Sequence, residues 1–163
     1  MTVTHYRTFE SPIGVLTLAG EGDYLTNLVL EDAAHPPTDR VGWVEEPTAF
    51  PDVAEQLQGY FAGERTEFEV ALRPAGTYFQ RSVWDALKEI PYGETRSYGD
   101  IARAVGRPGA SRAVGLANGR NPIAIIVACH RVIGADGSLT GYGGGLAVKR
   151  ALLDLELSVV SSR

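Results

Sequence analysis

A change of pattern near residue 75 constrains the fold of this chain more than any other feature of its sequence. From residue 5 to residue 30, apolar and polar side chains alternate, with two interruptions by turn residues. Such alternation predicts strands, and the interruptions predict the turns of a small antiparallel sheet. After residues 73–76 the apolar side chains recur at helical spacing instead. We therefore predict an α+β protein, with an N-terminal domain of residues 1–75 and a C-terminal domain of residues 76–163.

The remainder of the N-terminal domain is predicted to be a scaffold for this sheet. Apolar residues from 50 to 61 follow helical spacing, with Pro51 near the start and Gly63 just past the end. Alternation returns over residues 66–72 and predicts a further strand. Residues 32–47 carry three prolines among polar side chains and are predicted to form a long loop. No residue in this half of the chain suggests chemistry.

The C-terminal domain is predicted to be mainly helical. Thr77 is placed to cap a helix that Pro91 and Gly93 stop. Ser97 is placed to cap a second, short helix, and after a Gly/Pro turn a third helix covers residues 110–118. The last two helices have the spacing of a helix-turn-helix, which favours DNA binding. The same arrangement is common in all-helical cores, so the spacing leaves both interpretations open.

Charge is distributed unevenly along the 163 residues, whose formal net charge is −5. Residues 1–70 hold 3 Lys and Arg against 13 Asp and Glu, whereas residues 71–163 hold 12 against 7. Six arginines and one acidic residue fall within residues 96–131. Such a segment can face the phosphates of DNA, but a solvated surface that is arginine-rich by chance gives the same pattern.

The second helix of the predicted helix-turn-helix presents small residues to the outside. We expect Val114 and Ala117 to face the core. Three residues are then expected on the opposite, DNA-facing surface, with Arg112 beside them: Ser111, Gly115 and Asn118. Such a surface lets the helix backbone approach a groove closely but offers few side chains that read bases. It suits binding to duplex DNA by shape, with little preference for sequence.

The single cysteine, Cys129, has the surroundings that a reactive thiol requires. It ends an apolar run, residues 123–129, which we predict to be a buried strand, and a glycine-rich loop of residues 134–145 follows. Thiolate is the nucleophilic form, so we expect neighbouring groups to lower the pKa of the thiol. His130 is the candidate base. It is expected to act through a water, because adjacent residues of a strand point to opposite faces.

Glu156 is a candidate to orient His130, since a base of this kind needs an acidic partner. It falls in the helix that we predict for residues 147–157. Each of these residues also has a structural interpretation: a lone cysteine is usually a small buried hydrophobe, and an unplaced glutamate is usually exposed. The sequence alone does not bring Glu156 to His130.

Composition excludes several classes of protein. The longest apolar run is far shorter than the roughly 20 residues that span a bilayer, so no membrane association is expected. No basic segment leads into an apolar stretch at the N-terminus, so the location is predicted to be cytoplasmic. One cysteine forms no disulfide within the chain, and the three histidines lie far apart. We therefore predict no metal site, no cofactor and a monomer.

Several motifs in combination resemble those of the O6-alkylguanine-DNA alkyltransferases. Residues 129–134, which follow Asn121 and Pro122, are similar to the Pro-Cys-His-Arg-Val motif of that family. Further segments match it at the same spacings: Tyr92 to Glu94 with Ser97 and Tyr98, Ser111 to Gly115, and Tyr142 with Gly144 to Lys149. The resemblance covers about half of the chain. It implies direct-reversal repair, in which one alkyl (methyl) group moves from O6-alkylguanine in double-stranded DNA to Cys129 after base flipping.

The resemblance also implies roles for individual residues. Cys129 would accept the alkyl group, His130 would act through a water as base, and Glu156 would orient His130. Asn121 would brace the turn that carries the cysteine. Tyr98 would rotate the 3′ phosphate and assist proton transfer at the guanine.

Further roles concern the flipped base. Arg112 would fill the space that the nucleotide leaves, and Tyr142 and Gly143 would form the substrate pocket. Gly143 stands where the family often has serine, which leaves only a backbone N–H to bond O6 and a roomier pocket. Ala128 replaces the family's proline and frees the backbone before the cysteine. The cysteines that hold zinc in some relatives are missing.

Two other functions compete with repair. A non-repairing member of the wider family would bind alkylated DNA and recruit other proteins, but the retained Cys129 argues against this. A Cys-His hydrolase would use the glycine-rich loop as a source of oxyanion donors and would turn over repeatedly. That function would leave the helix-turn-helix unexplained.

Overall fold

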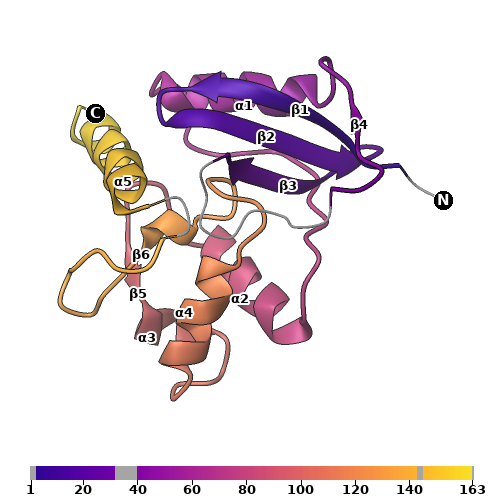
Figure 1. Cartoon of the computed structure of the whole chain (residues 1–163). Helices are drawn as coiled ribbons and strands as arrows, with labels where there is room; N and C mark the ends of the chain where they lie inside the picture. Colours follow the sequence, from indigo (N-terminus) through magenta and orange to yellow (C-terminus); the bar gives the residue numbers. More distant parts are fainter. Residues whose placement is uncertain (1–2, 32–39, 143–144, 163) are drawn as a thin grey trace.

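The computed structural model describes residues 3–31, 40–142 and 145–162 (Figure 1). A sheet with one helix beside it forms the upper part of the molecule in Figure 1, and most of the C-terminal helices lie below it. The sheet has the strand order β3-β2-β1-β4: β1 (His5–Ser11), β2 (Gly14–Glu21), β3 (Tyr24–Leu30) and β4 (Val44–Glu45). The first three strands are antiparallel, and β4 pairs with β1 in parallel, within the predicted loop. The predicted α+β class is confirmed.

Helix α1 (Pro51–Phe61) packs against the sheet and buries its apolar side chains. Leu16 and Leu18 of β2 have no solvent exposure, and they belong to the same core cluster as Leu57 and Tyr60 of α1. Pro51 stands in the first turn, where its missing N–H costs no helical hydrogen bond. Gly63, with a φ of 75°, follows the end of the helix. The predicted helix is therefore present with the predicted boundaries.

The outer edge of β3 is covered by two segments from elsewhere in the chain. Leu25 donates its N–H to Ala71 O (2.9 Å) and accepts from Arg73 N (2.8 Å). Leu28 donates to Pro122 O (2.8 Å) and accepts from Ala124 N (2.9 Å). Segment 66–72 therefore pairs with β3 only through an isolated bridge between Leu72 and Leu25. The prediction of a strand in this segment is wrong.

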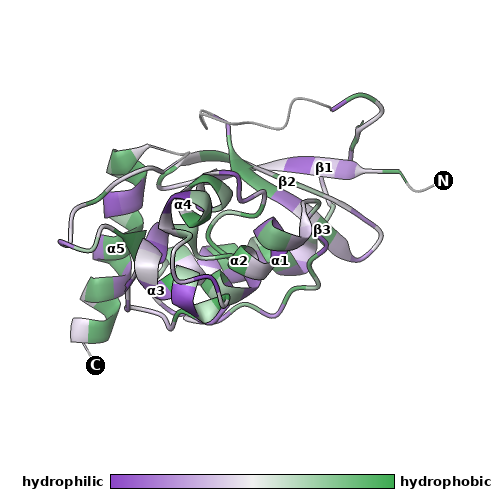
Figure 2. Ribbon diagram, turned by 90° about the horizontal axis from the view of Figure 1, so that it is seen from below, coloured by the Kyte–Doolittle hydropathy of each residue, from purple (hydrophilic) through white to green (hydrophobic). Residues whose placement is uncertain are grey.

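In its described residues, the C-terminal half of the chain packs four α-helices around short irregular segments: α2 (Tyr78–Lys88), α3 (Tyr98–Ala104), α4 (Ser111–Gly119) and α5 (Leu146–Ser161). Seen from below in Figure 2, α2 and α5 each carry both hydrophobic and hydrophilic residues, as amphipathic helices do. Ser97 caps α3, as predicted, and α3 and α4 flank the Gly/Pro turn of the helix-turn-helix. Within the described ranges, no helix has both the length and the apolar character needed to cross a bilayer.

Residues 123–129, predicted to be a buried strand, form a series of turns instead. Asn121 holds them together: its Nδ2 donates to Ile123 O (3.2 Å) and Val127 O (2.8 Å). Ile125 has a φ of 71°, which no regular strand contains. The run is apolar because it is buried, and burial alone does not distinguish a strand from a folded turn.

The turns lead into a 3-10 helix, η1 (Cys129–Arg131), and then into β6 (Val132–Ile133). β6 pairs in parallel with β5 (Arg96–Ser97), directly before α3. The sequence did not reveal this pair, because strands of two residues are too short to show a period. The pairing ties the segment that carries the cysteine to the start of the helix-turn-helix.

Loss of the cap of α2 should destabilise the protein. Thr77 Oγ1 accepts from Gln80 N (3.1 Å), and Gln80 Oε1 accepts from Thr77 N (2.9 Å). We expect Thr77→Ala to lower the free energy of unfolding by about 1 kcal/mol, because it leaves a helical N–H unpaired. Urea denaturation measures the change. Thr77→Ser keeps the hydroxyl and is the control; equal losses in both variants would contradict a capping role.

Candidate active site and nucleic-acid interface

Cys129 lies in the interior at the start of η1, with 5% of its surface exposed. Its N–H donates to Val127 O (2.8 Å), and its carbonyl accepts from Asn118 Nδ2 (3.3 Å). Burial raises the pKa of the thiol, although interactions with Asn121, Lys149 and Tyr142 oppose the shift. The prediction of a lowered thiol pKa is therefore wrong for the protein without DNA.

His130 and Glu156 form a buried pair that α5 brings together. His130 Nε2 lies 2.6 Å from Glu156 Oε2, and both side chains are almost completely inaccessible to solvent. Burial alone would raise the pKa of Glu156, but the hydrogen bonds from His130 and Arg131, together with the Arg131 charge, outweigh it and hold the pKa at about 2. Glu156 is therefore a carboxylate, which only accepts hydrogen bonds.

The proton of His130 must consequently be on Nε2. Burial lowers the pKa of His130, and the Glu156 carboxylate opposes this only in part, so the ring is neutral near pH 7. Nδ1 then carries the free electron pair. This atom is buried and has no hydrogen-bond partner among the described residues. It is the atom of the ring that can take a proton.

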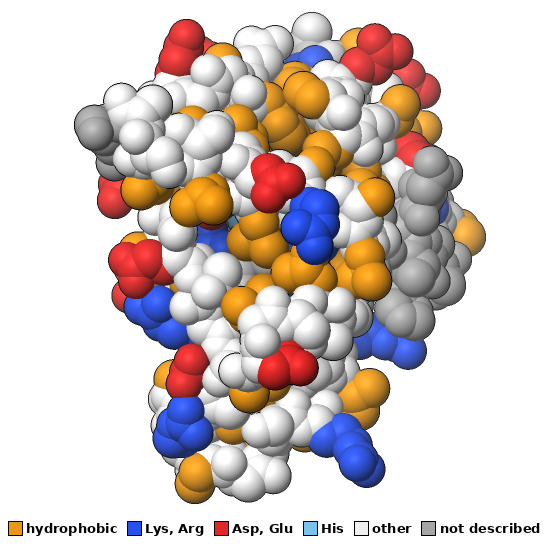
Figure 3. Space-filling view, turned by 90° about the vertical axis from the view of Figure 1, so that its left-hand side faces the viewer, with side chains coloured by type: hydrophobic (Ala, Val, Ile, Leu, Met, Phe, Trp, Pro, Cys, Tyr) orange, Lys and Arg blue, Asp and Glu red, His pale blue; other side chains and the backbone are white. Residues whose placement is uncertain are grey.

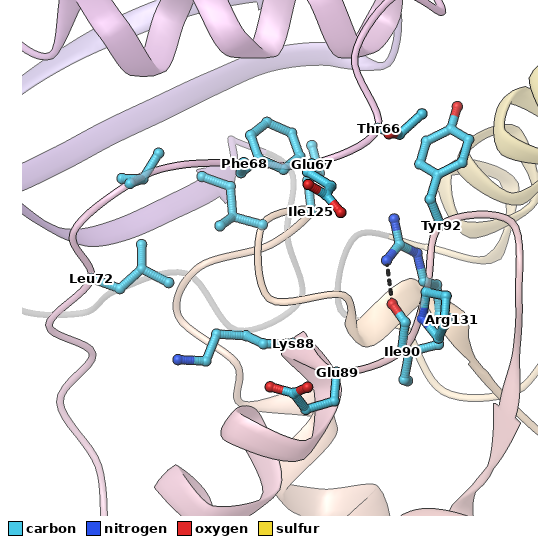
Figure 4. A pocket seen from close by; sticks show the side chains of 13 residues that line it. Thr66, Glu67, Phe68, Leu72, Lys88, Glu89, Ile90, Tyr92, Ile125 and Arg131 are labelled. Atoms are coloured by element: carbon cyan, nitrogen blue, oxygen red, sulfur yellow. Dashed lines mark hydrogen bonds between the residues drawn. The ribbon is translucent and has the colours of Figure 1, made fainter.

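Sequence reasoning missed two residues that contact Glu156. Arg131 donates from Nε to Oε1 (2.8 Å) and from Nη2 to Oε2 (3.0 Å), and its Nη1 donates to Ile90 O (2.7 Å; Figure 4). The Tyr60 hydroxyl donates to Oε2 (2.6 Å) from α1, in the N-terminal half of the chain. Helical spacing marked position 60 only as apolar, although a buried tyrosine normally has a partner for its hydroxyl.

Lys149 is a further buried group whose role the sequence did not indicate. Its Nζ donates to Val132 O (2.5 Å) and Thr140 O (2.8 Å), so it joins β6 to the glycine-rich loop. Burial lowers the pKa of this amine, while the neighbouring Cys129 opposes the shift. A buried lysine on the otherwise amphipathic α5 gives no signal in the periodicity of the sequence.

Tyr98 and Tyr142 connect the loop to the rest of the site. The Tyr98 hydroxyl, from α3, donates to Thr140 O (3.1 Å) and accepts from Thr140 Oγ1 (3.2 Å). Tyr142 is half-buried, and burial together with Cys129 raises the pKa of its phenol. Gly143, the other predicted pocket residue, lies outside the described residues.

The exposed face of α4 differs from the prediction. Arg112 is exposed, as expected, and Leu116, with 70% exposure, lies one turn further along the same face. Ser111 and Gly115 are only half-buried, but Asn118 is 2% exposed and bonds the Cys129 carbonyl. Its predicted outward position is wrong because it follows Val114 by four residues, which places both on one face.

Separate basic side chains stand out on the lower half of the face shown in Figure 3, with acidic side chains between them. The helix-turn-helix and the residues directly after it carry four exposed arginines: Arg103, Arg107, Arg112 and Arg120. Phosphates are attracted to such a surface even though the whole chain is acidic.

One cavity of the structure does not include the thiol. It has a volume of about 540 Å³ and lies beside Arg131, with Tyr92, Ile125 and Phe68 in its walls (Figure 4). Neither Cys129 nor His130 lines it. The chemistry of the site therefore belongs to the buried Cys129 region and not to this cavity.

A helix-turn-helix joined to a buried cysteine with a histidine and glutamate pair defines a DNA-binding, group-transfer protein with a thiol nucleophile. Comparison with known proteins agrees. Residues 78–158 match the model for the 6-O-methylguanine DNA methyltransferase, DNA binding domain. Residues 4–74 match the 6-O-methylguanine DNA methyltransferase, ribonuclease-like domain. The chain belongs to the 6-O-methylguanine DNA methyltransferase family.

Individual relatives are similar over nearly the full length. The methylated-DNA–protein-cysteine methyltransferase of Mycobacterium bovis is 64% identical over 94% of this chain and 93% of its own. A relative of the same name from Methanosarcina acetivorans is 57% identical over 93% of this chain and 97% of its own. The crystal structure of Mycobacterium tuberculosis OGT in complex with DNA superposes with a TM-score of 0.91, at 63% identity over 95% of this chain and 94% of that one.

Stability should decrease as the pH falls below neutral. The unfolded chain protonates His130 near its ordinary pKa of 6.5, whereas the folded protein keeps it neutral to lower pH. Each pH unit below 6.5 should therefore cost up to about 1.4 kcal/mol. Glu156 adds a second loss as the pH falls from its ordinary pKa of 4.5 towards its folded value of about 2.

Urea denaturation between pH 8 and pH 4 measures this dependence. His130→Asn should flatten the slope between pH 7 and pH 5, while His5→Gln, the control on β1, should leave it unchanged. A free energy of unfolding that is constant from pH 7 to pH 5 in the wild-type protein would disprove a buried, neutral His130.

Proposed function

We propose that this chain repairs DNA by moving an alkyl group from O6 of guanine to Cys129, once per molecule. The observation that carries the proposal is the His130-Glu156 pair directly after Cys129, in which Glu156 accepts a hydrogen bond from Nε2 and leaves Nδ1 as the available base. Support comes from membership of the family and from relatives named methylated-DNA–protein-cysteine methyltransferase. The DNA complex of Mycobacterium tuberculosis OGT supports DNA as the partner.

The reaction begins with extrusion of the damaged base, because a buried thiol does not reach O6 of a stacked guanine. His130 Nδ1 then takes the proton of Cys129 through a water. The thiolate attacks the alkyl carbon in line with O6: the carbon–sulfur bond forms, the carbon–oxygen bond breaks, and its electron pair passes to the guanine. Tyr98 assists the delivery of a proton to the departing guanine, which restores the neutral, unalkylated base.

The raised pKa of the thiol fits this order of events. Before DNA binds, burial keeps Cys129 protonated and weakly reactive. The alkylated guanine in the pocket carries the carbon that the thiolate attacks, so the thiolate reacts as soon as it forms. Asn121 braces the turn by bonding the carbonyls of Ile123 and Val127, and so it fixes the direction of attack.

The DNA is met by α3 and α4 of the helix-turn-helix. Arg112 enters the duplex and fills the space left by the flipped nucleotide, and Tyr98 turns the 3′ phosphate. Ser111 and Gly115 allow close approach of the backbone, and Tyr142 lines the pocket. Asn118 is withdrawn from the DNA contacts and instead supports the carbonyl of Cys129. All of these residues belong to one chain, which favours a monomer.

Reaction with excess O6-methylguanine oligonucleotide should stop after one event per molecule. The thioether at Cys129 is stable, and no second thiol exists in the sequence to remove the group. Mass spectrometry should find one added methyl group on the peptide that contains Cys129. Cys129→Ser should bind the oligonucleotide without becoming methylated. Repaired DNA in excess over protein would indicate a hydrolase, and an unmodified Cys129 would indicate a pure binder.

Affinity for duplex DNA should fall as salt rises and should depend little on sequence. A tenfold or greater loss between about 50 and 200 mM salt is expected if several phosphates are contacted. Arg112→Ala should slow transfer from duplex DNA much more than it weakens binding, because flipping is lost. Arg73→Ala, on the exposed edge of the N-terminal domain, is the control. Affinity that does not change with salt would refute an electrostatic DNA interface.

A further inference from the structure

The Glu156 carboxylate accepts hydrogen bonds from both domains. Oε1 accepts from Gly93 N (3.1 Å) and Arg131 Nε (2.8 Å). Oε2 accepts from His130 Nε2 (2.6 Å), Arg131 Nη2 (3.0 Å) and the Tyr60 hydroxyl (2.6 Å). Four of these donors come from the C-terminal domain. The fifth, Tyr60, comes from α1, which lies close to α5 in Figure 1.

Packing fixes the Tyr60 hydroxyl on this carboxylate. The side chain has no solvent exposure, and its ring contacts those of Phe61, Phe68 and Tyr92 at centroid distances of 5.3, 5.5 and 6.1 Å. Burial and the Glu156 charge raise the pKa of the phenol far above its ordinary value of 10, so the hydroxyl keeps its proton and stays a donor. Its contribution to Glu156 is therefore constant across the working pH range.

Tyr60 and His130 use the same oxygen. A carboxylate oxygen that receives a strong hydrogen bond has less negative charge to offer a second donor. The Tyr60 hydroxyl thus weakens the pull of Oε2 on the Nε2 proton, and a weaker pull makes the ring less basic at Nδ1. We propose that Tyr60 is a positioning residue for alkyl transfer, which sets how strongly Glu156 holds His130 and how readily Nδ1 accepts and releases the Cys129 proton. This inference rests on the proposed function.

Other charged and titratable groups act on the same pair and stay in place when Tyr60 is changed. Arg131 of η1 and Lys149 of α5 act on His130 together with Glu156, and Tyr92 acts on Tyr60. Removal of the Tyr60 hydroxyl leaves Oε2 to His130 Nε2 and Arg131 Nη2. The hydrogen bond from Nε2 should then strengthen and the protonated ring should be favoured, so the His130 pKa should rise.

Tyr60→Phe tests the inference, because it removes the hydroxyl and keeps the ring. The single-turnover rate of methyl transfer decreases as the pH falls. In Tyr60→Phe this decrease should begin about one pH unit higher than in the wild type. The rate at pH 6 should fall several-fold, while the rate above pH 8 should stay within about twofold. Tyr6→Phe, which removes a hydroxyl from β1 of the same domain, is the matched control and should not change the profile.

A DNA-free measurement separates this inference from the proposed function. At pH 7, the Nε2 proton resonance of His130 should move downfield in Tyr60→Phe, and the added effect of Tyr60→Phe should vanish in a Glu156→Gln background. If the resonance does not move, the role of Tyr60 is overturned even if transfer occurs. The same conclusion follows if the rate falls equally at every pH and the melting temperature falls with it. A moved resonance without any transfer would instead overturn the proposed function.

Discussion

The buried carboxylate of Glu156 is the group on which the arrangement of the site depends. An ionised carboxylate in the interior is strongly unfavourable unless its oxygens are fully hydrogen-bonded. The donors that meet this requirement come from α1, from the turn after α2 and from η1. Only one packing of these elements brings them together around α5. The same packing orders His130 and buries the neighbouring thiol, so the stability of the interior and the chemistry have a common origin.

Sequence reasoning predicted the elements whose signals are local. The antiparallel strands, α1 with its proline and glycine boundaries, and the caps at Thr77 and Ser97 follow from periodicity and short-range hydrogen bonding. Residues 123–129 were misassigned because an apolar run records burial and not backbone direction. The bond from Tyr60 to Glu156 joins residues 96 positions apart, and no pattern in a single sequence encodes such a pair. The thiol pKa was misjudged for a related reason, since it depends on how deeply the tertiary fold buries Cys129.

Asn118 illustrates how a small error of helical phase changes an interpretation. Its place on the buried face of α4 turns a predicted DNA contact into a support for the Cys129 carbonyl. The helix thereby acts on both of its sides, with Arg112 towards the exterior and Asn118 towards the cysteine. Displacement of α4 by DNA would be transmitted to the reacting residue through this side chain. The exposed Leu116 also makes the outer face less uniformly small than the sequence suggested.

The covered edge of β3 affects how the protein unfolds. Residues 71–73, before α2, pair with the outward N–H and C=O groups of Leu25. Residues 122–124, before the cysteine, pair with those of Leu28. If the C-terminal half detached, an apolar strand edge with unpaired backbone groups would face solvent, and such edges recruit strands from other molecules. The halves should therefore melt in one cooperative transition. A fragment that contains only the sheet and α1 should aggregate rather than persist as an independent domain.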